Sequence, residues 1–126
     1  MLGNSQVTPT LPVVNLERAR GFYEKSLGLK PEGNEHNGQI TYKCGNGSRL
    51  HIYQRSEPTK ADHTAATFEV DNVESSVKEL RGKGVKFEEY DMPGLKTVNG
   101  IATLDNEKGA WFKDTEGNIL CIHQAL

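Results

Sequence analysis

Several features are scarce in this chain of 126 residues. It has only two cysteines, Cys44 and Cys121, which are too few for a disulfide framework and predict reduced thiols, as in the cytoplasm. No run of about 18 apolar residues occurs, so no membrane span is expected, and residues 1–6 have neither the basic start nor the apolar centre of a secretory signal. Lys and Arg number 15 against 17 Asp and Glu, and without a basic run nucleic acid is not an expected partner.

An internal repeat is the strongest feature that is present. Residues 47–54 (GSRLHIYQ) return near the C-terminus at 117–124 as GNILCIHQ. A second pair, residues 10–17 (TLPVVNLE) and 67–74 (TFEVDNVE), opens the two halves in the same way. A half of about 60 residues buries too little surface to be stable alone, so we expect the two copies to fold together or to pair across a dimer.

Each half is predicted to have the order βαβββ, which indicates an α+β fold. The chain is interpreted as a single domain, residues 1–126, whose two modules span 7–54 and 64–124, with a polar linker at 55–63. A long loop is expected at 91–108. Helical spacing predicts one helix that follows Asn15 and ends at Gly28, and a second helix that follows Asp71 or Asn72 and ends at Gly84. Alternation predicts strands at 7–13, 39–44, 49–54, 64–70, 85–90, 109–113 and 119–123.

Two segments resemble the vicinal oxygen chelate superfamily, which includes glyoxalase I, extradiol dioxygenases and bleomycin-resistance proteins. The first runs from Asn15-Leu16-Glu17-Arg18-Ala19 through Phe22-Tyr23 to Leu27-Gly28-Leu29, and the second covers residues 111–120. The resemblance spans most of the chain and is specific for the superfamily rather than for one member. It implies two tandem βαβββ modules that form curled mixed sheets around a cavity, and it implies a homodimer.

The resemblance also implies where a metal site would lie. In metal-dependent members each module supplies two ligands, usually His, Glu or Gln, and these positions correspond here to Thr8, His51, Ala65 and Cys121. Only His51 is a usual ligand, Ala65 cannot coordinate, and Cys121 would suit a soft metal as a thiolate. We therefore expect no cofactor, while a divalent metal held by a non-standard set that includes His51 remains the alternative.

Strand alternation predicts which side chains face the cavity. His51 would be a metal ligand, a general base or a hydrogen-bonded cavity histidine, and Cys121 would be a small buried residue or a reactive thiol. Trp111 would stack on a flat ligand, or would close the core or a dimer contact. The expected ligand-binding residues are Arg49, His51, Tyr53, Glu69, Trp111 and Cys121.

Polar residues outside the cavity give weaker signals. Glu88, Glu89 and Asp91 form an acidic cluster that would attract a cationic ligand or simply lie in solvent. His63, at the end of the linker, is expected to be solvated. The long loop that follows residue 91 is of a length typical of lids and ligand-contacting segments.

The function expected from the sequence is metal-free binding of a small organic molecule, an antibiotic or a metabolite. The alternative from another class is a metal-dependent lyase or dioxygenase that uses His51, and metal analysis of the protein would separate the two. A third interpretation is a regulatory or structural dimer with an empty cavity, although inward-facing Arg49, His51 and Glu69 argue against it because buried polar groups need partners. No catalytic residue is assigned.

Overall fold

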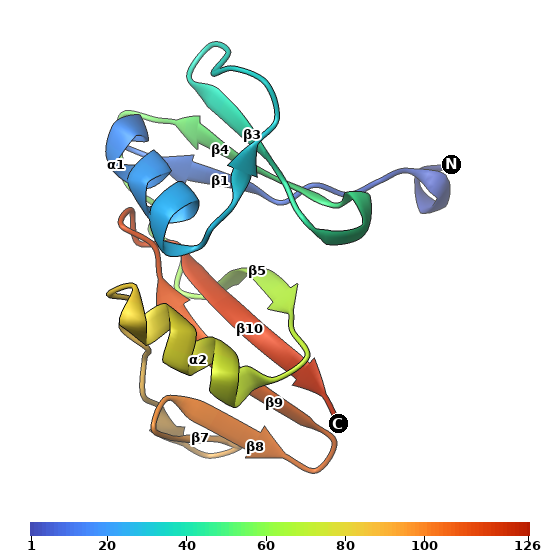
Figure 1. Cartoon of the computed structure of the whole chain (residues 1–126), viewed down its shortest axis with the longest axis vertical. Coiled ribbons are helices and arrows are strands. Elements are labelled where there is room, and N and C mark those ends of the chain that lie inside the picture. Colours follow the sequence, from blue (N-terminus) through green and yellow to red (C-terminus); the bar gives the residue numbers. More distant parts are fainter.

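The computed structural model describes residues 1–126 and shows an α+β fold with two separate sheets. Figure 1 shows the two modules stacked along the long axis, with the first module at the top and the chain before its first strand extending away from the body. This architecture confirms the expected fold class. No helix is long and apolar enough to cross a membrane.

The first module has one helix and four strands, whose sheet order is β1-β4-β3-β2. The parallel pair is formed by its first and last strands, and its other pairs are antiparallel. Short 3-10 turns occur at Leu2–Asn4 and Gly45–Gly47. The elements in chain order are β1 (Thr10–Val13), α1 (Leu16–Arg20), the π-helical segment η2 (Gly21–Ser26), β2 (Lys30–Pro31), β3 (Gln39–Lys43) and β4 (Arg49–Gln54).

The helix of the first module begins where the sequence predicts it. The Asn15 side chain accepts a hydrogen bond from the Arg18 backbone N–H at 3.0 Å, which caps the first turn. Leu16, Ala19 and Tyr23 are buried at helical spacing, so this face packs on the sheet. The segment ends before Gly28, whose φ of 74° is the left-handed conformation typical of a helix end.

The second module repeats this plan and adds strands. Its sheet order is β5-β10-β9-β8-β7-β6, and β5 and β10 form the parallel pair. Asn72 caps the helix through a 2.9 Å hydrogen bond from the Ser75 backbone N–H. The elements in chain order are β5 (Thr64–Glu69), α2 (Val73–Gly82), β6 (Asp91–Met92), β7 (Leu95–Val98), β8 (Ile101–Leu104), β9 (Glu107–Lys113) and β10 (Ile119–Ala125).

The prediction of a long loop at 91–108 is wrong, because this stretch folds into consecutive antiparallel hairpins. Gly94 has a φ of 82°, and Asn99 and Gly100 have φ values of 53° and 79°, which are turn conformations that join adjacent strands. The strand predicted at 85–90 is also wrong. Residues 85–90 make only one bridge to β9, Phe87 with Phe112, and the segment then leaves β9 because Tyr90 bonds to Thr97 of β7 instead.

A single cluster of 16 buried residues draws on both modules. Leu50 and Ile52 of β4, and Leu120 and Ile122 of β10, are at most 3% exposed, which confirms that they face the helices. Aromatic rings join the modules: the ring centroids of Phe22 in η2 and Phe112 in β9 are 6.2 Å apart. The helix-facing sides of both sheets therefore contribute to one core, and the opposite, helix-free face of each sheet is left for other contacts.

Candidate functional site

His51 lies at the centre of the helix-free face of the first sheet. It sits on β4 between Thr10 of β1 and Thr41 of β3, and it is half-buried. Its Nδ1 atom is 3.5 Å from the Gln39 amide nitrogen, a long contact that leaves the imidazole only weakly restrained. Tyr53 follows two residues later on the same face, is half-buried and makes no side-chain hydrogen bond. Both side chains are available to a ligand.

Arg49, the third predicted residue on β4, is already paired. Its guanidinium donates to the Glu32 carboxylate at 2.6 and 3.1 Å and to the Gln6 side chain at 3.3 Å. The hydrogen bonds between them raise the pKa of Arg49 and lower the pKa of Glu32. This ion pair ties β4 to the segment after β2, so Arg49 is less available to a ligand than His51 and Tyr53.

Trp111 is the main feature on the helix-free face of the second sheet. The indole Nε1 donates a 3.1 Å hydrogen bond to Thr64 on β5, and the Tyr90 ring meets the indole edge-on at 5.7 Å between centroids. The six-membered ring lies over Gly109, which has no side chain. A Cβ atom at this position would come within 3.3 Å of the indole Cη2, so the glycine leaves room for the ring. A half-exposed ring held in this way presents a fixed flat surface.

Cys121 is directly opposite Trp111 in the β9–β10 register and is only 5% exposed. Its Sγ atom lies 3.4 Å from the Ile122 carbonyl oxygen. Burial raises the pKa of the Cys121 thiol to about 11. The thiol is therefore neutral near pH 7, whereas nucleophilic attack and metal binding both need the thiolate.

Three strands of the second sheet meet through His123. Its Nδ1 is 2.6 Å from a Glu69 carboxylate oxygen on β5, and its Nε2 is 2.8 Å from a Glu107 carboxylate oxygen on β9. These hydrogen bonds, first from Glu69 and then from Glu107, raise the pKa of His123. When the ring is protonated, both nitrogens donate to these carboxylates, which is the charged form that the raised pKa favours.

Glu69 is on the face that the sequence predicts, and His123 lies two residues after Cys121 on the same face, whereas Glu107 is not among the predicted residues. The strand was expected to begin at Gly109, and Glu107 was assigned to the preceding loop. The signal was present in the alternation, because residues 107, 109 and 111 point to the same side once the strand is extended by two residues. Tyr90 was likewise treated as part of a strand rather than as a support for the tryptophan.

The residues at the four positions where the superfamily places metal ligands do not fit a metal. Thr8 and Ala65 supply no usual donor, and Cys121 is held as a neutral thiol. No group of three or more His, Cys, Asp or Glu side chains is arranged to hold an ion. His51 is the single member of the set with suitable chemistry.

The structure does not bring all the predicted residues together. His51 and Tyr53 belong to the first sheet and Glu69, Trp111 and Cys121 to the second, and no hydrogen bond or ring contact joins the two groups.

The predicted acidic cluster is also divided. The Glu89 carboxylate accepts from the Thr97 hydroxyl at 2.6 Å and the Gly100 backbone N–H at 2.8 Å, and these bonds lower the pKa of Glu89. Glu88 lies 3.6 Å from the Lys113 ammonium, and Asp91 begins β6. The carboxylates thus serve the hairpins of the second module rather than a common site.

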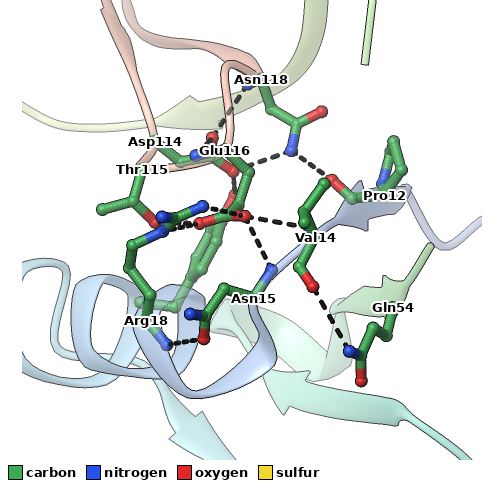
Figure 2. A network of polar contacts seen from close by, with 10 residues as sticks. Pro12, Val14, Asn15, Arg18, Gln54, Asp114, Thr115, Glu116 and Asn118 are labelled. Atoms are coloured by element: carbon green, nitrogen blue, oxygen red, sulfur yellow. Dashed lines mark hydrogen bonds and ion pairs between the residues drawn. The ribbon is translucent and has the colours of Figure 1, made fainter. Parts of the chain in front are cut away.

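A buried carboxylate joins the turn between β9 and β10 to the start of α1, as Figure 2 shows. Glu116 Oε1 accepts from the backbone N–H groups of Val14 and Asn15 at 2.9 and 3.0 Å, and Glu116 also pairs with the Arg18 guanidinium at 2.8 Å. Burial would raise the pKa of Glu116, but hydrogen bonds from Arg18, Thr115 and the backbone outweigh it and lower the pKa to about 2. The second module thereby caps the helix of the first.

Other members of this turn strengthen the junction. The Tyr23 hydroxyl donates a 2.6 Å hydrogen bond to the Asp114 carboxylate, and burial together with that carboxylate raises the pKa of Tyr23. The Asn118 amide donates to both Asp114 and the Pro12 carbonyl at 2.8 Å (Figure 2). The sequence predicts a turn at 114–118 between two strands, and the structure shows that this turn is also a polar contact between the modules.

Comparison with known proteins identifies the family. A family model of the Glyoxalase/Bleomycin resistance protein/Dioxygenase superfamily matches residues 5–122, and the chain belongs to that superfamily. The comparison with curated proteins finds no match.

Solved structures with this fold are similar over nearly the full chain. A protein from Bacillus anthracis described as a glyoxalase family member is 19% identical, with 96% of each chain covered and a TM-score of 0.72. A glyoxalase/bleomycin resistance protein from Catenulispora acidiphila is 20% identical, covering 96% of this chain and 98% of that chain, with a TM-score of 0.66. The fosfomycin resistance protein FosX from Listeria monocytogenes, in complex with Mn(II) and 1S,2S-dihydroxypropylphosphonic acid, is 14% identical, covering 98% and 90%, with a TM-score of 0.70. At these identities the similarity shows a shared fold.

Proposed function

We propose that this protein binds a small, flat organic molecule on the helix-free face of its second sheet, without a metal ion. The observation that carries the proposal is the fixed, half-exposed indole of Trp111. A ring that is already ordered loses little conformational entropy when a ligand stacks on it, so more of the contact energy contributes to affinity. Cys121, directly opposite Trp111 in the β9–β10 register, is buried and neutral, so it places no charge beside the stacking surface.

The polar groups around the indole would orient the ligand. His123 lies across from Gly109, over which the indole leans, so the Glu69–His123–Glu107 cluster borders the stacking surface. A ligand with hydrogen-bonding groups at its rim would meet carboxylate acceptors there, and the apolar centre of the ligand would meet Trp111. Antibiotics and metabolites with aromatic rings have this distribution of polarity.

The donor set supports binding without a metal. Thr8, Ala65 and Cys121 stand where metal-dependent superfamily members carry ligands, and none of them is a carboxylate or an imidazole. His51, the remaining position, is held weakly by Gln39 and would serve as a hydrogen-bonding partner. The alternative of a metal-dependent lyase or dioxygenase would need ligands that these positions do not supply.

We also propose that the protein is a homodimer. Within one chain the helix-free faces of the two sheets are separate, so His51 and Tyr53 would complete a cavity with Trp111 only if another copy brought a second sheet opposite. Exposed apolar side chains, among them Met92, Val98 and Leu104, offer contact area for association. Light scattering after size-exclusion chromatography measures the mass directly, and a monomer at all concentrations would contradict this part of the proposal.

The binding proposal can be tested by fluorescence, because Trp111 is the only tryptophan. Aromatic antibiotics and metabolites are titrated in the presence of a chelator, and a ligand that stacks on the indole should change its emission saturably. The same ligand should raise the unfolding midpoint, by the equivalent of about 2.7 kcal/mol at a hundred times its dissociation constant.

Variants separate stacking from other contacts. Trp111→Ala should weaken binding at least tenfold by thermal shift, whereas Trp111→Phe keeps a ring and should lose less. Tyr53→Phe is a matched control on the other sheet, and its effect reports whether the first sheet contributes to the same site. Stabilisation that requires a divalent metal and disappears in His51→Ala would contradict the proposal and favour the metal-dependent alternative.

A further inference from the structure

A second cavity lies on the opposite side of the second sheet from Trp111, where the two modules meet. It has a volume of about 190 Å³, and seven of its nine lining residues are apolar. Phe112 of β9 and Ile122 of β10 form its sheet side, and Leu27 and Leu29 approach it from the first module. Phe112 and Trp111 are neighbours on one strand, so their side chains point to opposite faces and the two sites are distinct.

The polar groups of this groove come from one helix. Ser76 and Glu79 line it from α2 and are three residues apart, so their side chains lie on the same side of the helix. Glu79 is the only charged residue in the lining, and it takes part in none of the ion pairs of the protein. The Ser76 hydroxyl makes no side-chain hydrogen bond either, whereas the hydroxyl of the adjacent Ser75 bonds to the Asn72 carbonyl.

These features define the chemistry of a ligand. An apolar wall with a single unpaired carboxylate at its rim is complementary to an apolar body that carries one positive charge. The hydroxyl beside the carboxylate can accept a second hydrogen bond from the same cationic group. A ligand with a carboxylate would be repelled by Glu79, and a purely apolar ligand would gain no polar contact from Glu79 or Ser76.

We propose that this groove binds a small amphiphilic cation, a protonated amine on a hydrocarbon body of roughly ten non-hydrogen atoms or fewer. The hydrocarbon packs against Phe112, Leu27 and Leu80, and the ammonium group lies between Glu79 and Ser76. Because the lining comes from both modules, the ligand bridges them and stabilises the native chain. The inference does not depend on the ligand proposed for the Trp111 face.

The test uses cyclohexylmethylamine, with cyclohexylmethanol and cyclohexanecarboxylate as matched compounds that differ only in the polar group. Binding is followed on the full-length protein by thermal shift and by NMR of the leucine methyl groups. The amine should bind in the millimolar range and about three- to fivefold more tightly than the alcohol, the gain typical of one partly exposed ion pair. The carboxylate should bind more weakly than both, and the shifted methyl signals should include those of Leu27 and Leu80.

Variants locate the site and its charge. Glu79→Gln should abolish the preference for the amine over the alcohol, whereas Glu17→Gln, which removes an exposed carboxylate from the other helix, should preserve it. Ser76→Leu should fill the groove and weaken all three compounds while it leaves the protein folded. Trp111→Phe should leave amine binding unchanged, which separates this site from the one proposed above.

Several results would overturn the inference. Equal affinity of the wild-type protein for the amine and the alcohol, or a preference that survives Glu79→Gln, would remove the role of the carboxylate. Unchanged affinity in Ser76→Leu, or chemical shifts confined to the Trp111 face, would place the ligand elsewhere. Absence of binding by the amine at concentrations where millimolar affinity is measurable would also refute it.

Discussion

Replacing Glu116 by glutamine should destabilise the protein strongly, although the two side chains have nearly the same size. The carboxylate is fully inaccessible to solvent and accepts hydrogen bonds from two backbone N–H groups, the Arg18 guanidinium and the Thr115 hydroxyl. Glutamine keeps only one acceptor oxygen, and its NH2 group would face donors. The helix start at Asn15 would also lose the negative charge that complements its N-terminus.

The pKa of Glu116 sets the magnitude. A decrease from 4.5 to about 2 on folding corresponds to roughly 3 kcal/mol in favour of the folded, ionised state. Leaving a buried donor without its acceptor typically costs about 1–3 kcal/mol, and Glu116 accepts from two backbone N–H groups, so the two considerations agree. We therefore expect Glu116→Gln to lower the free energy of unfolding by about 3 kcal/mol at pH 7, a large part of the stability of a domain of this size.

The assay is urea unfolding followed by circular dichroism at several pH values. The folded-state pKa is depressed, so this stability is fully present above the unfolded pKa of 4.5 and is lost as the pH falls toward 2. The difference between the wild type and Glu116→Gln should accordingly shrink between pH 5 and pH 2. Glu17→Gln, an exposed carboxylate whose nearest cation is 3.9 Å away, is the control and should change stability by less than about 0.5 kcal/mol.

Two outcomes would refute this reasoning. A loss of less than about 1 kcal/mol at pH 7 would mean that the carboxylate contributes no more than an ordinary surface ion pair. A larger loss that stays constant down to pH 2 would show that the effect is steric and not linked to ionisation.

Two further predictions follow from the second sheet. Titration of the His123 ring by NMR should give a pKa above 6.5, and this pKa should fall in Glu107→Gln. Because the pKa is raised on folding, the stability that it contributes is present below pH 6.5 and disappears as the pH rises through the folded value. An unchanged pKa in the variant would contradict the hydrogen bond between His123 and Glu107. At pH 8 only about one Cys121 thiol in a thousand should be ionised. Ellman's reagent should therefore modify half-buried Cys44 first, and Cys121 only when the sheet opens. Equal rates of modification in the native protein would contradict the burial of Cys121.

The helices and most strands could be predicted because their signals are local. Asn15 and Asn72 cap helices wherever they precede an amphipathic run, and the alternation around Leu50 and Leu120 specifies which face of a strand is buried. The hairpins over 91–108 were missed although Asn99-Gly100 is a strong turn signal, since the short strands beside it carry little alternation.

The candidate site was predictable only in part. Alternation placed Trp111, Cys121 and Glu69 on one face, but it could not show that Thr64 and Tyr90 hold the indole. Those contacts join positions that are 47 and 21 residues from Trp111, and their spacing contains no periodic signal. Glu107 differs, because its alternation with Gly109 and Trp111 is a local signal that is lost only when the strand is predicted to begin at Gly109.

The sequence by itself determined the repeated module, the two capped helices and the absence of usual metal donors at three of four positions, because each depends on residue identity or short-range spacing. Only the tertiary structure decided that the helix-facing sides of the sheets share one core, that Arg49 is paired with Glu32, and that Glu116 caps a helix about a hundred residues earlier. Hydrogen bonds and ion pairs of this kind depend on distances of a few ångströms between remote segments, and those distances exist only after the chain has folded.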